Sequence, residues 1–296
     1  MKEEWDFGTV IGLIAGVICI TVAMIWPEGD TPEIIPTEGK GFRWEQLSWF
    51  FQPQSVFIVV GGVLCATLVN YPLKAVLSLR VVFKNVILSE KFDFTGTINK
   101  IVVLAEKSRK DGLLSLEAGL DDIESVFLRN GVELAINERD SNRLRTFLSM
   151  DLNNISTRHI GSQEIILYMA AYAPAFGMLG TVLGLIIMMN KFQMSGETSS
   201  IDFNVAEQFA SLLSGMGTAL ITTFYGVFFA NMVFLPIAGK LKRRSENELM
   251  LKNIVLEGII SIHGREHPIL IKEKLMTFVA LSERKILEEK EGKFGA

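Results

Sequence analysis

The chain has 296 residues, of which 49% are hydrophobic, and its mean hydropathy is positive. This composition exceeds the apolar content of an ordinary soluble domain and indicates a membrane protein. The formal net charge of -4 is a near-balance of 29 basic and 33 acidic residues, so the chain offers no basic face for nucleic acid.

Four stretches are long and apolar enough to cross a bilayer, which takes a helix of about 20 mostly apolar residues. They run from Phe7 to Trp26, Ser55 to Leu79, Ile165 to Met189 and Gln208 to Ile237, and their only charged residue is Lys74. The sequence therefore predicts an all-α polytopic membrane protein with four transmembrane helices. The first is expected to be retained rather than cleaved, because its leader carries two acids and no small-residue cleavage site follows it.

The distribution of basic residues predicts the orientation. They gather after the second and fourth spans, whereas the loops that join spans one to two and three to four hold only Lys40, Arg43 and Lys191. Because lysine and arginine concentrate on the cytoplasmic side of membrane helices, both termini and the central block are expected to be cytoplasmic. The expected organisation is two transmembrane helices with an outer loop in 1–79, a helical cytoplasmic domain in 80–164, two further transmembrane helices in 165–239 and cytoplasmic helices in 240–296.

The two cytoplasmic regions have helical patterns. Asp93 or Thr95 is expected to cap a helix near the start of the central block. Further along, apolar residues recur at intervals of three and four, which predicts one amphipathic helix over Leu113, Leu116, Leu120, Ile123 and Phe127. After the fourth span, Ser245 to His263 is predicted to continue as a helix, and Gly264 and Pro268 mark its end and the start of the next helix.

Small and hydroxyl-bearing residues mark the third and fourth spans. Gly180 and Gly184 lie four residues apart, which favours close packing of helices. Thr181 lies about 24 Å and Thr223 about 21 Å from the cytoplasmic ends of their spans, at 1.5 Å per residue, so the two hydroxyls of antiparallel helices reach a similar depth. Thr222 adds a second hydroxyl beside Thr223. Two interpretations stay open: the hydroxyls bond back to carbonyls of their own helices, or all three line a hydrated ion path.

Two prolines lie inside these spans. Pro174 is near the middle of the third and Pro236 is near the inner end of the fourth. Each removes a helix hydrogen bond, so each is either a fixed kink or a hinge that couples ion occupancy to the cytoplasmic block.

The sequence contains no phosphate-binding loop, no nucleophile elbow and no cluster with metal-ligand spacing. We therefore expect no enzyme activity, no catalytic residue, no cofactor and no metal site. Because the four spans contain no carboxylate, the chain is either an inert anchor or the wall of an ion path whose acid comes from a partner.

Four strings resemble the signature of MotA/PomA flagellar stator subunits, in order and over nearly the whole chain. They are the cytoplasmic string AEKSRKDGLLSLE at 105–117 and the membrane strings APAFGMLGT at 173–181, ALITTFYG at 219–226 and VFLPIA at 233–238. The chain departs from the usual pattern in a long insert at Gly39 to Phe51, in Phe51-Gln52-Pro53 before the second span, and at Gly217, where alanine is common.

The resemblance implies a pentamer of this chain in the bacterial inner membrane around a dimer of a MotB/PomB-type, peptidoglycan-binding partner. That partner supplies a membrane aspartate, H+ or Na+ is the coupling ion, and ion flow turns the ring against the rotor protein FliG. By the same resemblance, Arg109 and Glu117, with Lys110 and Glu106 beside them, contact the rotor. The alternative is an ExbB/TolQ-like energiser of outer-membrane processes, although four spans and a long central block favour the stator; a plain scaffold is a further alternative.

Overall fold

The computed structural model describes residues 3–5, 7–25, 48, 50–90, 92–197 and 205–279. The insert predicted at Gly39 to Phe51 therefore lies almost wholly outside the described residues. Nearly all described residues are helical, apart from turns and one pairing of two short strands, β1 (Glu3–Trp5) and β2 (Leu88–Glu90). The all-α class is thus confirmed.

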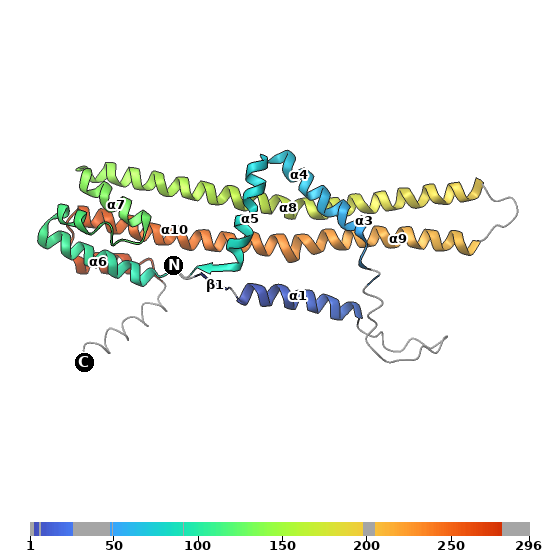
Figure 1. Cartoon of the computed structure of the whole chain (residues 1–296), viewed down its shortest axis with the longest axis horizontal. Coiled ribbons are helices and arrows are strands. Elements are labelled where there is room, and N and C mark those ends of the chain that lie inside the picture. The colour runs from blue at the N-terminus through green and yellow to red at the C-terminus, as the bar shows by residue number, and fades with distance from the viewer. Residues whose placement is uncertain are drawn as a thin grey trace. The chain divides into compact units, whose positions relative to one another are not determined.

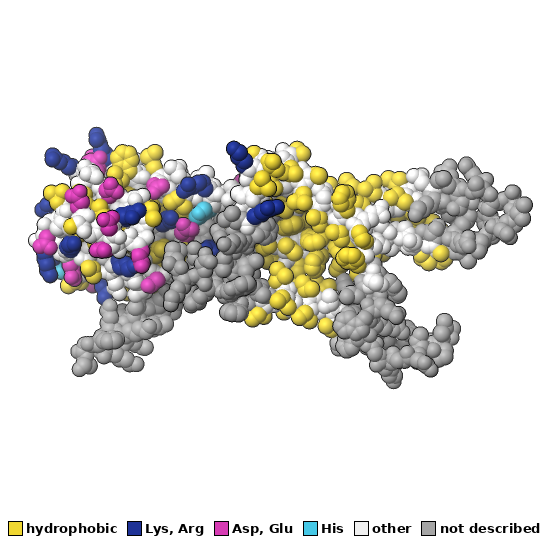
Figure 2. Space-filling model, in the orientation of Figure 1, with side chains coloured by type: hydrophobic (Ala, Val, Ile, Leu, Met, Phe, Trp, Pro, Cys, Tyr) yellow, Lys and Arg dark blue, Asp and Glu magenta, His cyan; other side chains and the backbone are white. Residues whose placement is uncertain are grey.

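The chain divides into two compact units, which we name by their surfaces. The apolar unit contains residues 3–89 and 162–241, and the described part of the charged unit contains 90–161 and 242–279. The units divide at 89, 161 and 241, where the sequence suggested 79, 164 and 239. Figure 2 shows the difference between them, since hydrophobic side chains cover one and mixed acidic and basic side chains cover the other.

The apolar unit begins with α1 (Phe7–Ile25) and continues with α3 (Pro53–Val56), the π-helix η1 (Phe57–Gly61), α4 (Gly62–Asn70) and α5 (Leu73–Ile87). Its remaining elements are the second half of α8 (Ser141–Glu197), then α9 (Val205–Phe228), the π-helix η3 (Phe229–Phe234) and the start of α10 (Leu235–His263). In Figure 1, α8 and α9 run antiparallel along one another.

Within the described residues, three helical stretches are long and apolar enough to cross a membrane: Pro53–Asn70, Ser141–Asn190 and Leu212–His263. They contain most of the second, third and fourth predicted spans. The first predicted span is helical over Phe7–Ile25, and its apolar part, Ile11–Ala23, is shorter than the other three.

The second predicted span is interrupted, which the sequence interpretation missed. Ser55 to Leu79 was expected as one helix, but α4 ends at Asn70 and Tyr71 is extended, with φ -128° and ψ 146°. Proline disfavours the helical conformation of the residue before it and donates no hydrogen bond, so Pro72 separates α4 from α5.

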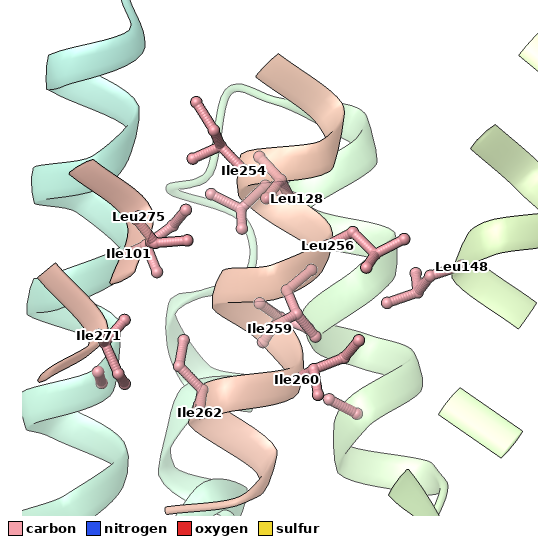
Figure 3. Close-up of a cluster of buried hydrophobic side chains, with 14 of the residues drawn as sticks. Ile101, Leu128, Leu148, Ile254, Leu256, Ile259, Ile260, Ile262, Ile271 and Leu275 are labelled. Carbon is pink, nitrogen blue, oxygen red and sulfur yellow. The ribbon is translucent and has the colours of Figure 1, made fainter. Parts of the chain in front are cut away.

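The charged unit is a helical bundle around one hydrophobic core. It contains α6 (Phe94–Asp111), the 3-10 helix η2 (Leu113–Gly119), α7 (Val126–Asn137), α11 (Pro268–Met276) and the adjoining parts of α8 and α10. Figure 3 shows how α10 contributes a central row of side chains, with Ile254, Ile259 and Ile262 directed toward the surrounding helices. Gly258 of α10 lies against Ile101 of α6, where an added Cβ would meet the Ile101 side chain at 2.6 Å.

The sequence predicted several helix boundaries of this unit correctly. Asp93 caps α6 as expected, because its carboxylate accepts a 2.7 Å hydrogen bond from the Gly96 amide. The end of α10 at His263 and the start of α11 at Pro268 are also confirmed.

The single amphipathic helix expected from Leu113 to Phe127 is wrong. A short 3-10 helix precedes a turn, and Ser125 then caps α7 by accepting from the Leu128 amide. All five apolar residues of the pattern nevertheless pack on the core. The periodicity thus identified the buried side chains, whereas the polar turn at 120–125 divided the expected helix into η2 and α7.

Candidate ion-path and coupling sites

Glycines bring α8 and α9 into close contact in the apolar unit. An added Cβ at Gly184 would lie 3.2 Å from Ala219 Cβ, and one at Gly180 would lie 2.7 Å from Thr222 Cβ. At the next level, an added Cβ at Gly226 would lie 2.6 Å from the carbonyl oxygen of Ala173. The backbones therefore approach as closely as small residues allow, which confirms the packing role expected for Gly180 and Gly184.

These contacts set the relative depth of the threonines. Gly180 faces Thr222, so Thr181 and Thr223, which follow them in sequence, lie at nearly the same level of the antiparallel pair. This relative level agrees with the similar depths estimated from helix rise.

The three hydroxyls differ in access. Thr222 is fully buried and donates to the Ala219 carbonyl at 2.7 Å. Thr181 is partly exposed and donates to the Met178 carbonyl at 2.6 Å, and Thr223 is also partly exposed. In this conformation α8 covers the side chain of Thr222, whereas the side chains of Thr181 and Thr223 are partly exposed at the surface of the α8 and α9 helix pair.

Back-bonding and ion binding are compatible at Thr181. A hydroxyl has one proton to donate and two lone pairs that accept. The bond to Met178 uses the proton and leaves the oxygen's lone pairs for a cation or for a donor. Back-bonding and ion binding are thus not exclusive at a partly exposed threonine. The hydroxyl of Thr222 is fully buried, so an ion cannot reach it in this conformation.

Both prolines lie inside long helices that belong to both units. Pro174 lies within α8, and its Cα would be 3.2 Å from a Cβ added at Gly226. Pro236 is the second residue of α10, and α10 directly follows the π-helix η3. A π-turn shifts the register of backbone hydrogen bonds, which accommodates a residue that cannot donate one.

An aromatic contact holds the segment before the second span against α9. The Tyr225 hydroxyl donates to the Phe50 carbonyl at 2.5 Å, and the Phe50 and Phe224 rings meet edge to face at 5.8 Å between centroids. Sequence reasoning gave Tyr225 no role, because no local signal relates two residues so far apart in the chain. It also passed over Asn231, an exposed amide in η3 that donates to the Val227 carbonyl.

The four residues expected to contact the rotor form an exposed charged patch of the charged unit. Glu106, Arg109 and Lys110 lie in the last turns of α6, and Glu117 follows on η2. All four side chains are exposed. Gly112 makes the turn between the two helices, so both signs of charge lie around one corner of the unit.

An ion network joins three helices of the charged unit. Arg145 of α8 binds Glu257 of α10 through two hydrogen bonds of 2.7 and 3.0 Å, and Lys274 of α11 lies 3.4 Å from the same carboxylate. The hydrogen bonds from Arg145 lower the pKa of Glu257 below its ordinary value, although partial burial opposes the shift. Lys274 also donates to Ser261, which is fully buried.

Comparison with known proteins agrees with this geometry. Residues 120–253 match the MotA/TolQ/ExbB proton channel family. The chain is 34% identical to motility protein A of Treponema phagedenis over 81% of this chain and 88% of that protein. It is 27% identical to the chemotaxis protein PomA of Vibrio alginolyticus over 93% of this chain and 95% of that protein.

A solved structure has the same fold. It is the flagellar MotAB stator complex from Bacillus subtilis, with a TM-score of 0.75 at 24% identity, covering 94% of this chain and 98% of the matched one. The likeness of sequence over most of the chain, together with this fold, confirms the resemblance seen in the four strings. The chain belongs to the MotA/PomA family of flagellar stator subunits, within the MotA/TolQ/ExbB proton channel family.

Proposed function

We propose that the α8 and α9 pair forms one wall of the ion path of a flagellar stator, with Thr181 and Thr223 as its oxygen ligands. The proposal rests on one observation: two partly exposed hydroxyls lie at nearly the same level of two helices that pack closely through glycines. Membership of the family makes the chain an ion-conducting stator subunit and not an enzyme.

The path needs an acid from another chain. The predicted spans contain no carboxylate, and a hydroxyl oxygen alone neither carries a proton nor neutralises a cation. A MotB/PomB-type partner would place its membrane aspartate opposite Thr181 and Thr223. The matched solved structure is a MotAB complex, which supports such a partner for this chain.

The assembly we propose is a homo-pentamer around a dimer of that partner, in the bacterial inner membrane. Each chain crosses four times, and both termini and the charged unit are cytoplasmic. The apolar surface of one unit supports membrane insertion, and the mixed charges of the other support contact with water.

Coupling would use the two helices that continue from one unit into the other. Pro174 lies on α8 and Pro236 on α10, so a change of bend at either proline would redirect the charged end of the same helix. One elementary charge that falls through 100 mV releases about 2.3 kcal/mol, and this free energy would drive the change of bend.

The exposed charges at Glu106, Arg109, Lys110 and Glu117 suit a contact with FliG that forms and breaks at every step. Exposed ion pairs stabilise a contact by only about 0 to 1 kcal/mol each, so they steer a partner without trapping it. A rotor contact of this kind releases readily.

Two isosteric changes test the proposed ion path. Thr223→Val removes a hydroxyl from the path and should strongly reduce swimming speed. Thr222→Val removes a buried hydroxyl that bonds to its own helix, so motility should be largely retained. Equal loss of motility in both variants, with normal assembly, would contradict the assignment of Thr223.

The coupling ion, H+ or Na+, is determined in cells that carry the native chain, with the Thr223→Val strain beside them. Swimming speed is measured against external sodium at fixed pH, and against pH at fixed sodium. A speed that follows sodium assigns Na+, and a speed indifferent to sodium assigns H+. A Thr223→Val defect that excess sodium relieves would place the hydroxyl at the ion itself.

A further inference from the structure

Helix α5 differs in direction from the span that precedes it. The break at Tyr71 and Pro72 ends α4, and Figure 1 shows α5 running across α8 rather than along it. A helix that turns aside where a membrane span ends has the placement of an interfacial helix, which lies in the membrane plane.

One face of α5 is fixed to the apolar unit. Leu79 is buried in its hydrophobic core, and Ala75, Val76 and Val82 pack against that core. These positions, spaced by three and four residues, define the inward side of the helix. The opposite side is therefore free of the unit's own core.

The outward face combines apolar and basic side chains. Leu73 is 62% and Leu77 52% exposed, and Lys74 and Arg80 are exposed on the same side of the helix. The 15 residues of α5 include a third basic residue, Lys84, and no aspartate or glutamate. A face of this composition is complementary to a surface whose outer layer is negatively charged and whose interior is apolar.

The surroundings of α5 indicate a bilayer surface. The last turns of α4 expose Leu68 and Val69, the latter to 90%, as expected of side chains that face acyl chains. At the break, the ring of Tyr71 lies 6.1 Å from that of Tyr168, which stacks on Tyr172. Tyrosines gather at the level of lipid headgroups, so this cluster marks the boundary at which α5 begins.

We propose that α5 is a binding site for anionic phospholipid headgroups. Lys74 and Arg80 bind the phosphates, and Leu73 and Leu77 insert between the acyl chains. This site is separate from the ion path and goes beyond the proposed function. It would fix the position of the subunit at the membrane surface while α8 and α9 move.

The test uses the full chain purified with its partner in a nonionic detergent. Fluorescently labelled phosphatidylglycerol is the anionic probe, and phosphatidylcholine with the same label is the neutral one. Each basic residue near a membrane surface changes affinity for anionic lipid about fivefold, so Lys74→Gln with Arg80→Gln should weaken phosphatidylglycerol binding about 25-fold. Phosphatidylcholine binding should not change, and rising salt should weaken only the anionic probe.

The matched control is Arg139→Gln with Arg143→Gln, which removes two exposed charges from the charged unit. This pair should bind phosphatidylglycerol as the native protein does. An equal loss in both pairs, or no loss in the α5 pair, overturns the proposal. A change of oligomer mass with unchanged lipid binding overturns it too, because the face would then belong to a neighbouring copy.

A second measurement needs no substitution and keeps the proposal testable if the α5 variant fails to assemble. Photoactivatable phosphatidylglycerol is cross-linked to the native complex, and the labelled peptides are identified by mass spectrometry. Labelling concentrated on 71–84 is expected. Labelling spread evenly over basic peptides would refute a lipid site. So would labelling that inorganic phosphate reduces more strongly than chloride does at the same ionic strength.

Discussion

Gly226→Ala is the sharpest test of the contact between α8 and α9. The added Cβ would lie 2.6 Å from the carbonyl oxygen of Ala173, 3.0 Å from Gly177 Cα and 3.2 Å from Pro174 Cα. All three are backbone atoms of α8, so no side chain can rotate away and the helices must separate.

The magnitude follows from comparison with a neutral position in the same helix. Gly217 also lies in α9, and an added Cβ there meets nothing within 4 Å. Alanine improves helix propensity by up to about 1 kcal/mol at either position, so this gain cancels in the comparison. Overpacking costs about 1 to 3 kcal/mol, and Gly226→Ala should therefore be less stable than Gly217→Ala by about that amount.

The assay is unfolding of the purified complex in detergent, followed by swimming of cells that carry each variant. Gly217→Ala should unfold at or above the native temperature and support normal motility. Gly226→Ala should unfold earlier and lose speed, because separation of α8 and α9 moves Thr181 relative to Thr223. Equal unfolding and equal motility of the two variants would refute the close approach of the helices.

Three further predictions concern the charged unit. Arg109→Glu should abolish motility while membrane assembly stays intact, whereas Arg139→Glu, also exposed, should swim normally; normal swimming of both variants would count against the rotor patch. The lowered pKa of Glu257 means that its carboxylate stabilises the fold at neutral pH, and that this contribution disappears as pH falls from its ordinary value of 4.5 through its value in the folded protein. Glu257→Gln should therefore cost about 1 to 3 kcal/mol at pH 7 and flatten the acid side of the stability profile, and an unchanged profile would show that Arg145 does not hold the charge. Asp93→Ala should destabilise the unit by about 1 kcal/mol, measured as faster hydrogen exchange in the first turn of α6, and unchanged exchange there would mean that the cap is dispensable.

Much of the fold followed from local patterns. The apolar spans, the cap at Asp93 and the helix boundaries near Gly264 and Pro268 each rest on residues adjacent in sequence, so the chemistry that defines them is readable without the fold. The depth of Thr181 and Thr223 was also accessible, because helix rise is constant along both spans.

Other features depend on contacts across the fold. Whether a threonine is buried depends on the neighbouring helix: Thr222 lies under Gly180, whereas Thr223, one residue on, is partly exposed. The π-helices η1 and η3 have no sequence signature, and the contact of Tyr225 with Phe50 joins segments 175 residues apart. Pro72 is a sequence signal for the break before α5. The break was missed because the residues on both sides of the proline are apolar and together predict one span.

We propose that this chain conducts ions only with an acid from its partner. The most direct measurement compares ion entry into cells that express the chain with its native partner and with a partner whose membrane aspartate is changed to asparagine. Entry of the coupling ion should be present with the native partner and absent with the altered one, while both complexes assemble to equal levels. Equal ion entry in the two strains would contradict the claim and place the acid elsewhere.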